Sequence, residues 1–199
     1  MRHKGISWQE LPPPGGYGSA EYKAIVPSGN LPAMIHDGFM LADSEAIAEY
    51  LDEAFPKVPM LPDTVQLRAK AREKSRLHDT RLEPAVRALY PQVAHQSRDQ
   101  GAVRLGGDAI SKHLAALSLL LLNDPLDGEK LWLCDCGFAV TFEWIEAFEA
   151  AMGLEVIWPE NVLSYRASLG RFAAVAKEID AYRPAMTDYL KKAYPDTQE

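Results

Sequence analysis

The sequence predicts a small α/β domain followed by an all-helical domain. Glycine and proline divide residues 1–62 into short pieces that leave room only for short strands and helices. A proline-rich stretch without helical periodicity, residues 56–63, comes next. From Thr64 onward the apolar residues recur at helical spacing. We therefore assign residues 1–55 to the α/β domain, residues 56–63 to a linker and residues 64–199 to the helical domain.

Short strands are expected in the first domain at residues 6–11, 33–36 and 39–42. The last two form the clearest hairpin, because Asp37-Gly38 between them is a strong signal for a two-residue turn. Asp43 follows the hairpin and can cap a helix whose apolar residues recur at i, i+3, i+4 and i+7. These residues are Ile47, Tyr50, Leu51 and Ala54, and Phe55-Pro56 ends the helix.

Long helices are expected in the second domain. The first runs from Leu67 to Leu89, and Pro84 is expected to kink it. The second covers residues 102–122, and its C-terminal half is apolar all round, which predicts burial. Its most hydrophobic stretch, Leu114 to Leu122, is too short to cross a bilayer.

Further helices complete the second domain. One runs from Phe138 to Met152 and ends at Gly153, a typical C-terminal cap. Asp135 is the candidate to cap its N-terminus. Residues 162–193 form one or two more helices, with a break expected near Arg183-Pro184.

Composition excludes several classes of protein. Twenty-eight acidic residues against 21 basic ones give a formal charge of −7 and a pI near 5.3. No basic run is long enough to make a nucleic-acid-binding face, so no nucleic acid is expected as a partner. The first five residues are charged but lack the apolar segment of a signal peptide. We therefore expect a cytoplasmic protein that does not bind a membrane.

The two cysteines, Cys134 and Cys136, are more simply small buried hydrophobic residues than a redox pair. A disulfide between residues so close in sequence would be strained. Two cysteines are also too few for a structural zinc site. No metal is expected.

The segment Asp43-Ser44 carries its own binding chemistry. A helix N-terminus leaves backbone N–H groups unpaired and carries positive partial charge, so it attracts a carboxylate. Ser44 adds a hydroxyl donor there, and Asp43 can accept from an ammonium group. Together they suit the zwitterionic head of an amino acid. An ordinary Asp-capped helix is the alternative interpretation of these two residues taken alone.

Two stretches at a characteristic spacing resemble the glutathione transferase superfamily. The first is Leu31-Pro32-Ala33-Met34, and the second is Asp43-Ser44-Glu45-Ala46-Ile47. Both at this spacing, followed by Phe55-Pro56, make the match specific, and it covers nearly the whole chain. The resemblance implies a thioredoxin-like N-terminal domain and a glutathione transferase-type C-terminal helical bundle.

The resemblance also implies a binding site for glutathione, used as a co-substrate. The γ-glutamyl head would lie at Asp43 and Ser44. Pro32 would follow a cis peptide bond, and the backbone of Leu31 would pair with the cysteinyl part of glutathione in the manner of an added strand. Asn30 stands where relatives often place a polar residue near the glycine end.

The thioredoxin-like domain looks incomplete at its N-terminus. In relatives, a strand and a helix precede the segment matched here, and they hold the Ser, Tyr or Cys that stabilises the glutathione thiolate. That catalytic residue is expected upstream of Met1. Either the true start lies upstream, or the protein has lost this element. We favour an upstream start, because the remaining pieces are still patterned to pack against the missing strand.

The function implied by the resemblance is conjugation of the glutathione thiolate to a hydrophobic, electrophilic small molecule in a cleft between the two domains. An isomerase or dehalogenase of the same family is a variant of this interpretation. Homodimers are usual in the family. The alternative is a non-catalytic protein of the same fold that binds ligands or partners.

Other polar residues are weaker candidates. His36 lies beside Asp37 at the tip of the expected hairpin, where an exposed turn residue is the simpler interpretation. His78 lies beside Asp79 on the inner stripe of a long helix that in relatives lines the substrate cleft. Tyr17 stands in a glycine-rich loop, as an exposed aromatic residue or a ligand contact.

Overall fold

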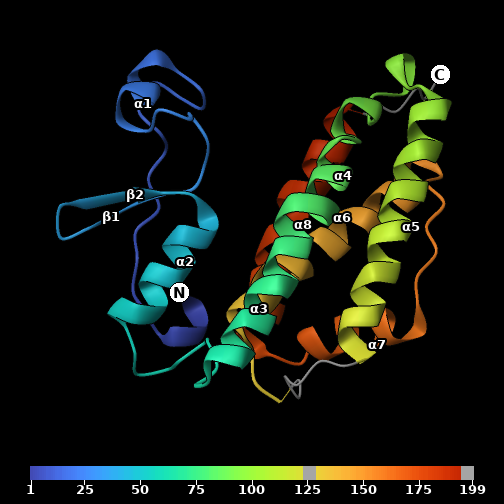
Figure 1. Ribbon diagram of the computed structural model, residues 1–199. Coiled ribbons are helices and arrows are strands. Elements are labelled where there is room, and N and C mark those ends of the chain that lie inside the picture. Colours follow the sequence, from blue (N-terminus) through green and yellow to red (C-terminus); the bar gives the residue numbers. More distant parts are fainter. Residues whose placement is uncertain (123–128, 194–199) are drawn as a thin grey trace. The chain divides into compact units, whose positions relative to one another are not determined.

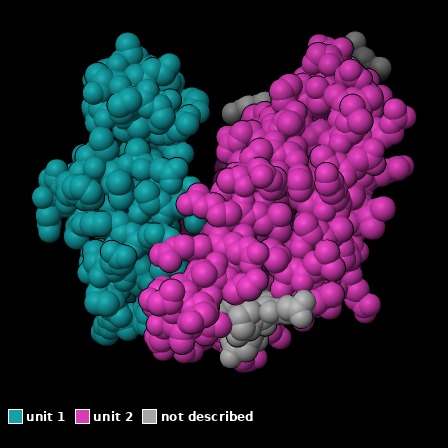
Figure 2. Space-filling view, viewed as in Figure 1, with its two compact units in different colours: residues 1–61 teal, residues 62–199 magenta. Residues whose placement is uncertain are grey.

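The chain divides into two compact units, residues 1–61 and residues 62–199 (Figure 2). The computed structural model describes residues 1–122 and 129–193. In the described residues, the first unit combines a two-stranded sheet with short helices, and the second contains helices without strands (Figure 1). This is the expected order of an α/β unit and a helical unit. Residues 123–128 and 194–199, which the sequence assigns to the helical domain, lie outside the described residues.

The hairpin of the first unit is confirmed. Strands β1 (Ala33–His36) and β2 (Phe39–Ala42) pair antiparallel, with Ala33 opposite Ala42. Asp37-Gly38 joins them, and these two residues have φ values of 50° and 81°. Positive φ at both central positions is what the tight turn favoured in hairpins requires.

Helix α2 (Ser44–Ala54) is also confirmed, with Asp43 as its N-cap and Phe55 at its C-terminal end. Ile47 and Leu51 are buried, as their spacing predicts. The helix contacts both strands of the hairpin. The apolar side of α2 therefore covers one face of this small sheet.

The interpretation of His36 as an exposed turn residue was wrong. His36 is the last residue of β1, and its side chain is 34% exposed. Its Nδ1 lies 2.7 Å from the hydroxyl of Tyr50, and its ring packs 5.2 Å from that of Phe55. His36 therefore fastens the hairpin to α2, because two of its neighbours belong to that helix and its C-terminal end.

The strand predicted at residues 6–11 is absent. These residues follow a 3-10 turn, η1 (Arg2–Lys4), and join no ladder. A strand is stable only beside a neighbour, and the sheet of the described residues holds only β1 and β2. A short helix that the sequence did not reveal, α1 (Ala20–Ile25), comes before the hairpin.

A buried ion pair closes the first unit. The Lys4 ammonium lies 2.6 Å from Oδ1 of Asp52, and both side chains are less than one-tenth exposed. The same carboxylate accepts from the backbone N–H groups of Met60, at 2.8 Å, and Leu61, at 3.1 Å. Asp52 thus links the N-terminal segment and the connector after α2 to this helix.

The first helical stretch of the second unit is interrupted. Helix α3 (Val65–Leu77) passes into a π turn, η2 (His78–Leu82), and then into α4 (Glu83–Arg87). Pro84 lies in the first turn of α4 and has no N–H to donate to the residue four positions back. The irregularity expected at Pro84 is therefore a π turn just before it. Short 3-10 turns lie elsewhere in this unit, namely η3 (Tyr90–Gln92), η4 (His95–Ser97) and η5 (Leu133–Asp135).

Helix α5 (Gln100–Leu122) is longer than predicted, and its C-terminal half is buried on one face only. Leu114 and Leu117 are fully buried, but Leu119 is 66% exposed and Leu122 is 68% exposed. The prediction of burial all round was wrong, because neighbouring helices cover one side of α5.

By length and composition, α5 is the one helix in the described residues that could cross a membrane, a test that core helices also pass. Polar bonds link it to the segment that ends in α7 (Glu160–Leu169). The Ser111 hydroxyl accepts from the N–H of Ile157 at 2.9 Å, and the Ser118 hydroxyl donates to the Asn161 side chain at 2.8 Å. These contacts and its buried face make α5 a helix of the bundle.

Helix α6 (Cys136–Met152) ends at Gly153, whose φ of 67° confirms the predicted C-terminal cap. Helix α8 (Ala173–Ala193) contains Pro184 in its interior. The break predicted near Arg183-Pro184 was wrong, since it lies between α7 and α8. Trp144 of α6 holds the helix on both sides of the proline, because it donates to the Tyr182 hydroxyl at 3.0 Å and packs against the ring of Tyr189, and these contacts offset the lost hydrogen bond.

Asp135 does not cap α6 with its side chain, contrary to expectation. Its Oδ1 lies 3.0 Å from the Lys74 ammonium of α3 and accepts from the Tyr165 hydroxyl of α7 at 2.6 Å. Its Oδ2 accepts from the backbone N–H of Trp132 at 2.9 Å. Both charged side chains are about 95% buried. This carboxylate therefore joins three elements of the bundle.

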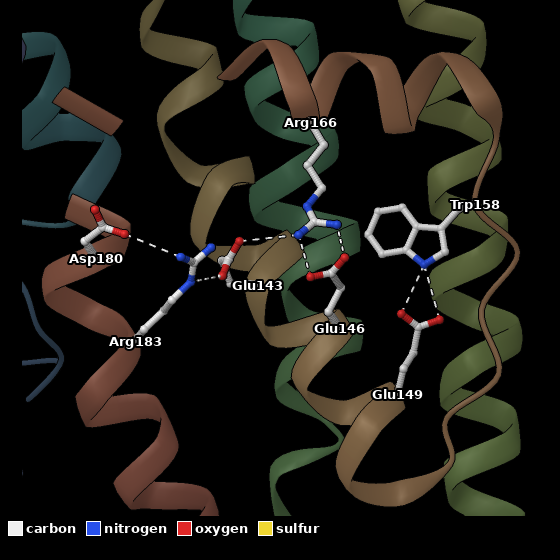
Figure 3. Close-up of polar contacts among 7 residues, drawn as sticks. All are labelled: Glu143, Glu146, Glu149, Trp158, Arg166, Asp180 and Arg183. Atoms are coloured by element: carbon white, nitrogen blue, oxygen red, sulfur yellow. Dashed lines mark hydrogen bonds and ion pairs between the residues drawn. The ribbon is translucent and has the colours of Figure 1, made fainter. Parts of the chain in front are cut away.

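A second polar network crosses α6, α7 and α8 (Figure 3). Glu143 of α6 accepts from Nε of Arg183 at 2.9 Å and from Nη2 of Arg166 at 3.4 Å. Arg166 also bonds Glu146, and Arg183 also bonds Asp180. Glu143 bonds both arginines, so we call these five residues the Glu143 cluster.

We predict that Asp135→Asn lowers the free energy of unfolding by about 3 kcal/mol, because it removes the negative charge that lies 3.0 Å from the buried Lys74 ammonium. Urea unfolding at neutral pH measures the change. Asp188→Asn, an exposed change on α8, is the matched control and should be nearly neutral. Equal unfolding midpoints for the two variants would contradict the structural role of Asp135.

We predict that Glu143→Gln lowers the free energy of unfolding by about 1 kcal/mol, since two guanidinium groups lose a shared carboxylate near the surface. The loss should shrink in 1 M salt, because salt screens exposed ion pairs. Urea unfolding at low and high salt tests this, with the exposed Glu155→Gln as control. A loss that does not depend on salt would show that packing, and not charge, links these helices.

Candidate functional site

The hairpin brings the two predicted halves of the site together. Because Ala33 pairs with Ala42, the residues before β1 and the residues after β2 lie at the same open end of the hairpin (Figure 1). Leu31-Pro32 and Asp43-Ser44 are those residues. Residues eleven to thirteen positions apart in sequence therefore become neighbours.

Asp43 uses one carboxylate oxygen to cap α2. Its Oδ1 accepts from the N–H groups of Glu45 and Ala46, each at 3.1 Å, and no bond to Oδ2 is present in the described part of the chain. Asp43 has a backbone φ of 86°, which is uncommon for any residue other than glycine. Such backbone strain is typical of sites that hold a ligand.

Ser44 is the remaining donor at this helix end. The capping bonds of Asp43 leave the N–H of Ser44 unpaired within residues 1–122 and 129–193. The side chain is exposed, so its hydroxyl faces solvent. An N–H and an O–H from one residue at a helix N-terminus suit a carboxylate.

Leu31 offers its backbone. The Leu31–Pro32 peptide bond is cis, as expected, and Leu31 is 54% exposed. Neither its N–H nor its C=O has a hydrogen-bond partner in the part of the chain that the structure describes. These two groups are the ones that an extended peptide needs for strand-like pairing.

Asn30 is exposed, and its backbone is held from both sides. Its N–H donates to the Ser28 hydroxyl at 3.2 Å, and its C=O accepts from the Tyr22 hydroxyl at 2.9 Å. Sequence reasoning missed Tyr22 because it missed α1. The signal was present: Ser19 caps the helix, and Tyr22 and Val26 lie four residues apart on its buried side.

His78 belongs to the core and not to a substrate site. Its Nδ1 lies 2.7 Å from Asp79, and its Nε2 lies 2.7 Å from the Thr141 hydroxyl. The order of these bonds is that of an acid–base triad, but His78 and Thr141 are 7% and 5% exposed. A Cβ atom on Gly137 would stand 2.4 Å from the imidazole, so the ring is tightly enclosed. The triad geometry here serves packing.

The other candidates are also placed by the structure. Tyr17 is 70% exposed in its loop. Cys134 is buried, but Cys136 is exposed at the start of α6, so the interpretation of both as buried hydrophobic residues was wrong for Cys136. In the described residues no three His, Cys, Asp or Glu side chains are grouped so that they could hold a metal ion.

The second unit contains a cavity of about 320 Å³ between α6, α7 and α8. Apolar side chains such as Leu163 and Ile179 line it, together with Glu143, Arg166 and Arg183 of the Glu143 cluster. Glu143 already accepts from both arginines, so their charge is largely neutralised (Figure 3). The described residues that line the cavity include no Ser, Thr, Cys, His, Lys or Tyr.

Known proteins resemble this chain over most of its length. Residues 1–59 match the family model of the glutathione S-transferase N-terminal domain. The chain is 30% identical to maleylacetoacetate isomerase of Pseudomonas aeruginosa over 191 residues, which cover 92% of this chain and 85% of that protein. It is 27% identical to glutathione S-transferase Z1 of Arabidopsis thaliana over 139 residues, or 66% of this chain. That match spans only 63% of the length of the plant protein.

Among solved structures, a maleylpyruvate isomerase described as a bacterial zeta-class glutathione S-transferase superposes with a TM-score of 0.71. The identity is 22%, and the match covers 88% of this chain and 86% of that one. At this identity the likeness shows the fold, a thioredoxin-like unit followed by a helical bundle. The hairpin with its two motif halves, the family model and the long match to the bacterial isomerase agree, and the chain belongs to the glutathione transferase superfamily.

Proposed function

We propose that this protein binds glutathione at the open end of the β1–β2 hairpin and is a glutathione-dependent transferase or isomerase. The observation that carries the proposal is the strand register. It sets the unpaired backbone of Leu31 beside the helix N-terminus at Asp43 and Ser44. The N–H and C=O of Leu31 suit an extended peptide. Asp43 and Ser44 suit the charged head of an amino acid.

Each part of glutathione meets a matching group in this proposal. The γ-glutamyl carboxylate accepts from the N–H and the hydroxyl of Ser44, and its ammonium group donates to Oδ2 of Asp43. The cysteinyl backbone pairs with the N–H and C=O of Leu31. Asn30 and Pro32 flank that pairing, with the Asn30 side chain near the glycine end.

The reaction we propose is attack of the glutathione thiolate on a hydrophobic electrophile. A sulfur–carbon bond forms, and the electron pair moves to a leaving group or to a conjugated acceptor that then takes a proton. The protein contributes binding and proximity. In the isomerase variant, which the name of the Pseudomonas relative suggests, the electron pair on the conjugated acceptor returns before protonation and re-forms the double bond. The sulfur–carbon bond then breaks, and the glutathione thiolate is released unchanged.

The second candidate is a non-catalytic protein that binds glutathione-like ligands or a partner. It is favoured by one observation: the described groups at the open end of the hairpin, including Ser44, all face the γ-glutamyl head or the peptide backbone of the ligand in this proposal, and none of them faces its thiol. A chromogenic electrophile distinguishes the candidates. Glutathione-dependent conjugation above the uncatalysed rate supports the enzyme, while glutathione binding without turnover supports the binding protein.

We also propose a cytoplasmic homodimer, on the model of the family. Sedimentation equilibrium should then give twice the chain mass of 22.1 kDa. A mass of one chain across the micromolar range would contradict the dimer. The glutathione site itself does not depend on this result, because every residue assigned to it comes from one chain.

We predict that Ser44→Ala weakens glutathione binding at least tenfold, because a hydrogen bond to a charged group is lost. Isothermal titration calorimetry measures the dissociation constant. Ser164→Ala, an exposed change on α7, is the matched control and should bind as the unchanged protein does. Equal dissociation constants for Ser44→Ala and the control would refute the assignment of this site.

A further inference from the structure

A buried tyrosine lies directly behind the glutathione site. Tyr22 of α1 is only 4% exposed, and its hydroxyl donates to the carbonyl of Asn30 at 2.9 Å. This hydroxyl makes no other hydrogen bond in the described residues. Its single partner therefore belongs to the residue just before Leu31.

The acceptor of this bond shares a peptide group with the proposed ligand donor. The carbonyl of Asn30 and the N–H of Leu31 are the two ends of one trans peptide unit, which is planar. In such a unit the C=O and the N–H point in opposite directions. A donor that fixes the direction of the Asn30 carbonyl therefore also fixes the Leu31 N–H, and it directs that N–H away from Tyr22.

Few other hydrogen bonds fix the segment between α1 and β1 in the part of the chain that the structure describes. Its other backbone bonds are local: the N–H of Gly29 donates to the carbonyl of Val26 at 2.8 Å, and the N–H of Asn30 donates to Ser28 at 3.2 Å. Two side chains of α1 reach this loop: the Tyr22 hydroxyl bonds the Asn30 carbonyl, and the Lys23 stem packs against Gly29 without a hydrogen bond to the loop in the described residues. The position of Tyr22 is well determined, because Ser19 caps α1 and accepts from the N–H of Tyr22 at 3.0 Å.

We propose that Tyr22 is a positioning residue of the glutathione site, which orients the Leu31 N–H toward a main-chain carbonyl of the ligand. The inference rests on the proposed function. The hydrogen bond to the Asn30 carbonyl also polarises the peptide group, so the Leu31 N–H becomes a stronger donor. Tyr22 thereby favours an extended peptide over a free amino acid, which needs only Asp43 and Ser44.

Tyr22→Phe tests the proposal in the full chain, because it removes the hydroxyl and keeps the buried ring. We expect the dissociation constant for glutathione to rise about fivefold, the effect of one hydrogen bond. S-methylglutathione should show the same change, since the proposed contact is to the peptide backbone and not to the thiol. Isothermal titration calorimetry measures both ligands.

Tyr50→Phe is the matched control. It removes a tyrosine hydroxyl in the same unit, the one 2.7 Å from His36, and leaves the Asn30 carbonyl untouched. Its glutathione affinity should stay within about twofold of the unchanged protein, while its unfolding midpoint should fall by an amount similar to that of Tyr22→Phe. In nitrogen-15 spectra of the free proteins, the Leu31 amide signal should shift in Tyr22→Phe and not in Tyr50→Phe.

The outcomes separate this inference from the proposed function. If Ser44→Ala weakens glutathione binding and Tyr22→Phe does not, the positioning role is overturned and the glutathione site stands. If the two tyrosine variants lose equal affinity, the effect comes from lowered stability, which also overturns it. If glutathione does not bind the unchanged protein, the proposed function and the positioning role fail together.

Discussion

The site depends on the register of one hairpin. Two positive φ angles at Asp37-Gly38 allow a two-residue turn, and that turn sets Ala33 opposite Ala42. A slip of one residue would turn every side chain of a strand to the other face. It would also separate the Leu31 backbone from the N-terminus of α2. Contacts of both strands with α2 place the hairpin on this helix, while the turn alone sets the register.

Buried carboxylates give each unit its internal order. Asp52 gathers Lys4 and two backbone amides in the first unit, and Asp135 gathers Lys74, Tyr165 and a backbone amide in the second. In both, an aspartate accepts from a buried lysine and from loop N–H groups that would otherwise lack partners. Such pairs add little net stability, but removing one partner is costly, so they specify one arrangement of the elements.

Local signals predicted much of this structure. The hairpin, the cap at Asp43 and the end of α6 at Gly153 each follow from a few adjacent residues. The failures involve partners distant in sequence. Residues 6–11 have strand character but no neighbouring strand among the described residues, and Pro184 is tolerated because α8 packs on α6. Asp135 is an ordinary capping residue by sequence, and only the fold brings Lys74 to it. Tyr22 is the exception, because the Ser19 cap of its helix was a local signal that sequence reasoning overlooked.

The unpaired backbone of Leu31 has an evolutionary consequence. A ligand that binds to main-chain groups does not depend on which side chain stands at that position, provided the chain keeps its path. Position 31 is therefore able to drift among residues of different size and polarity without loss of the peptide contact. Position 44 has no such freedom, because there the side chain itself supplies a donor. Two neighbouring positions of one site are thus under unequal selection, and sequence variation among relatives should be read with that inequality in mind.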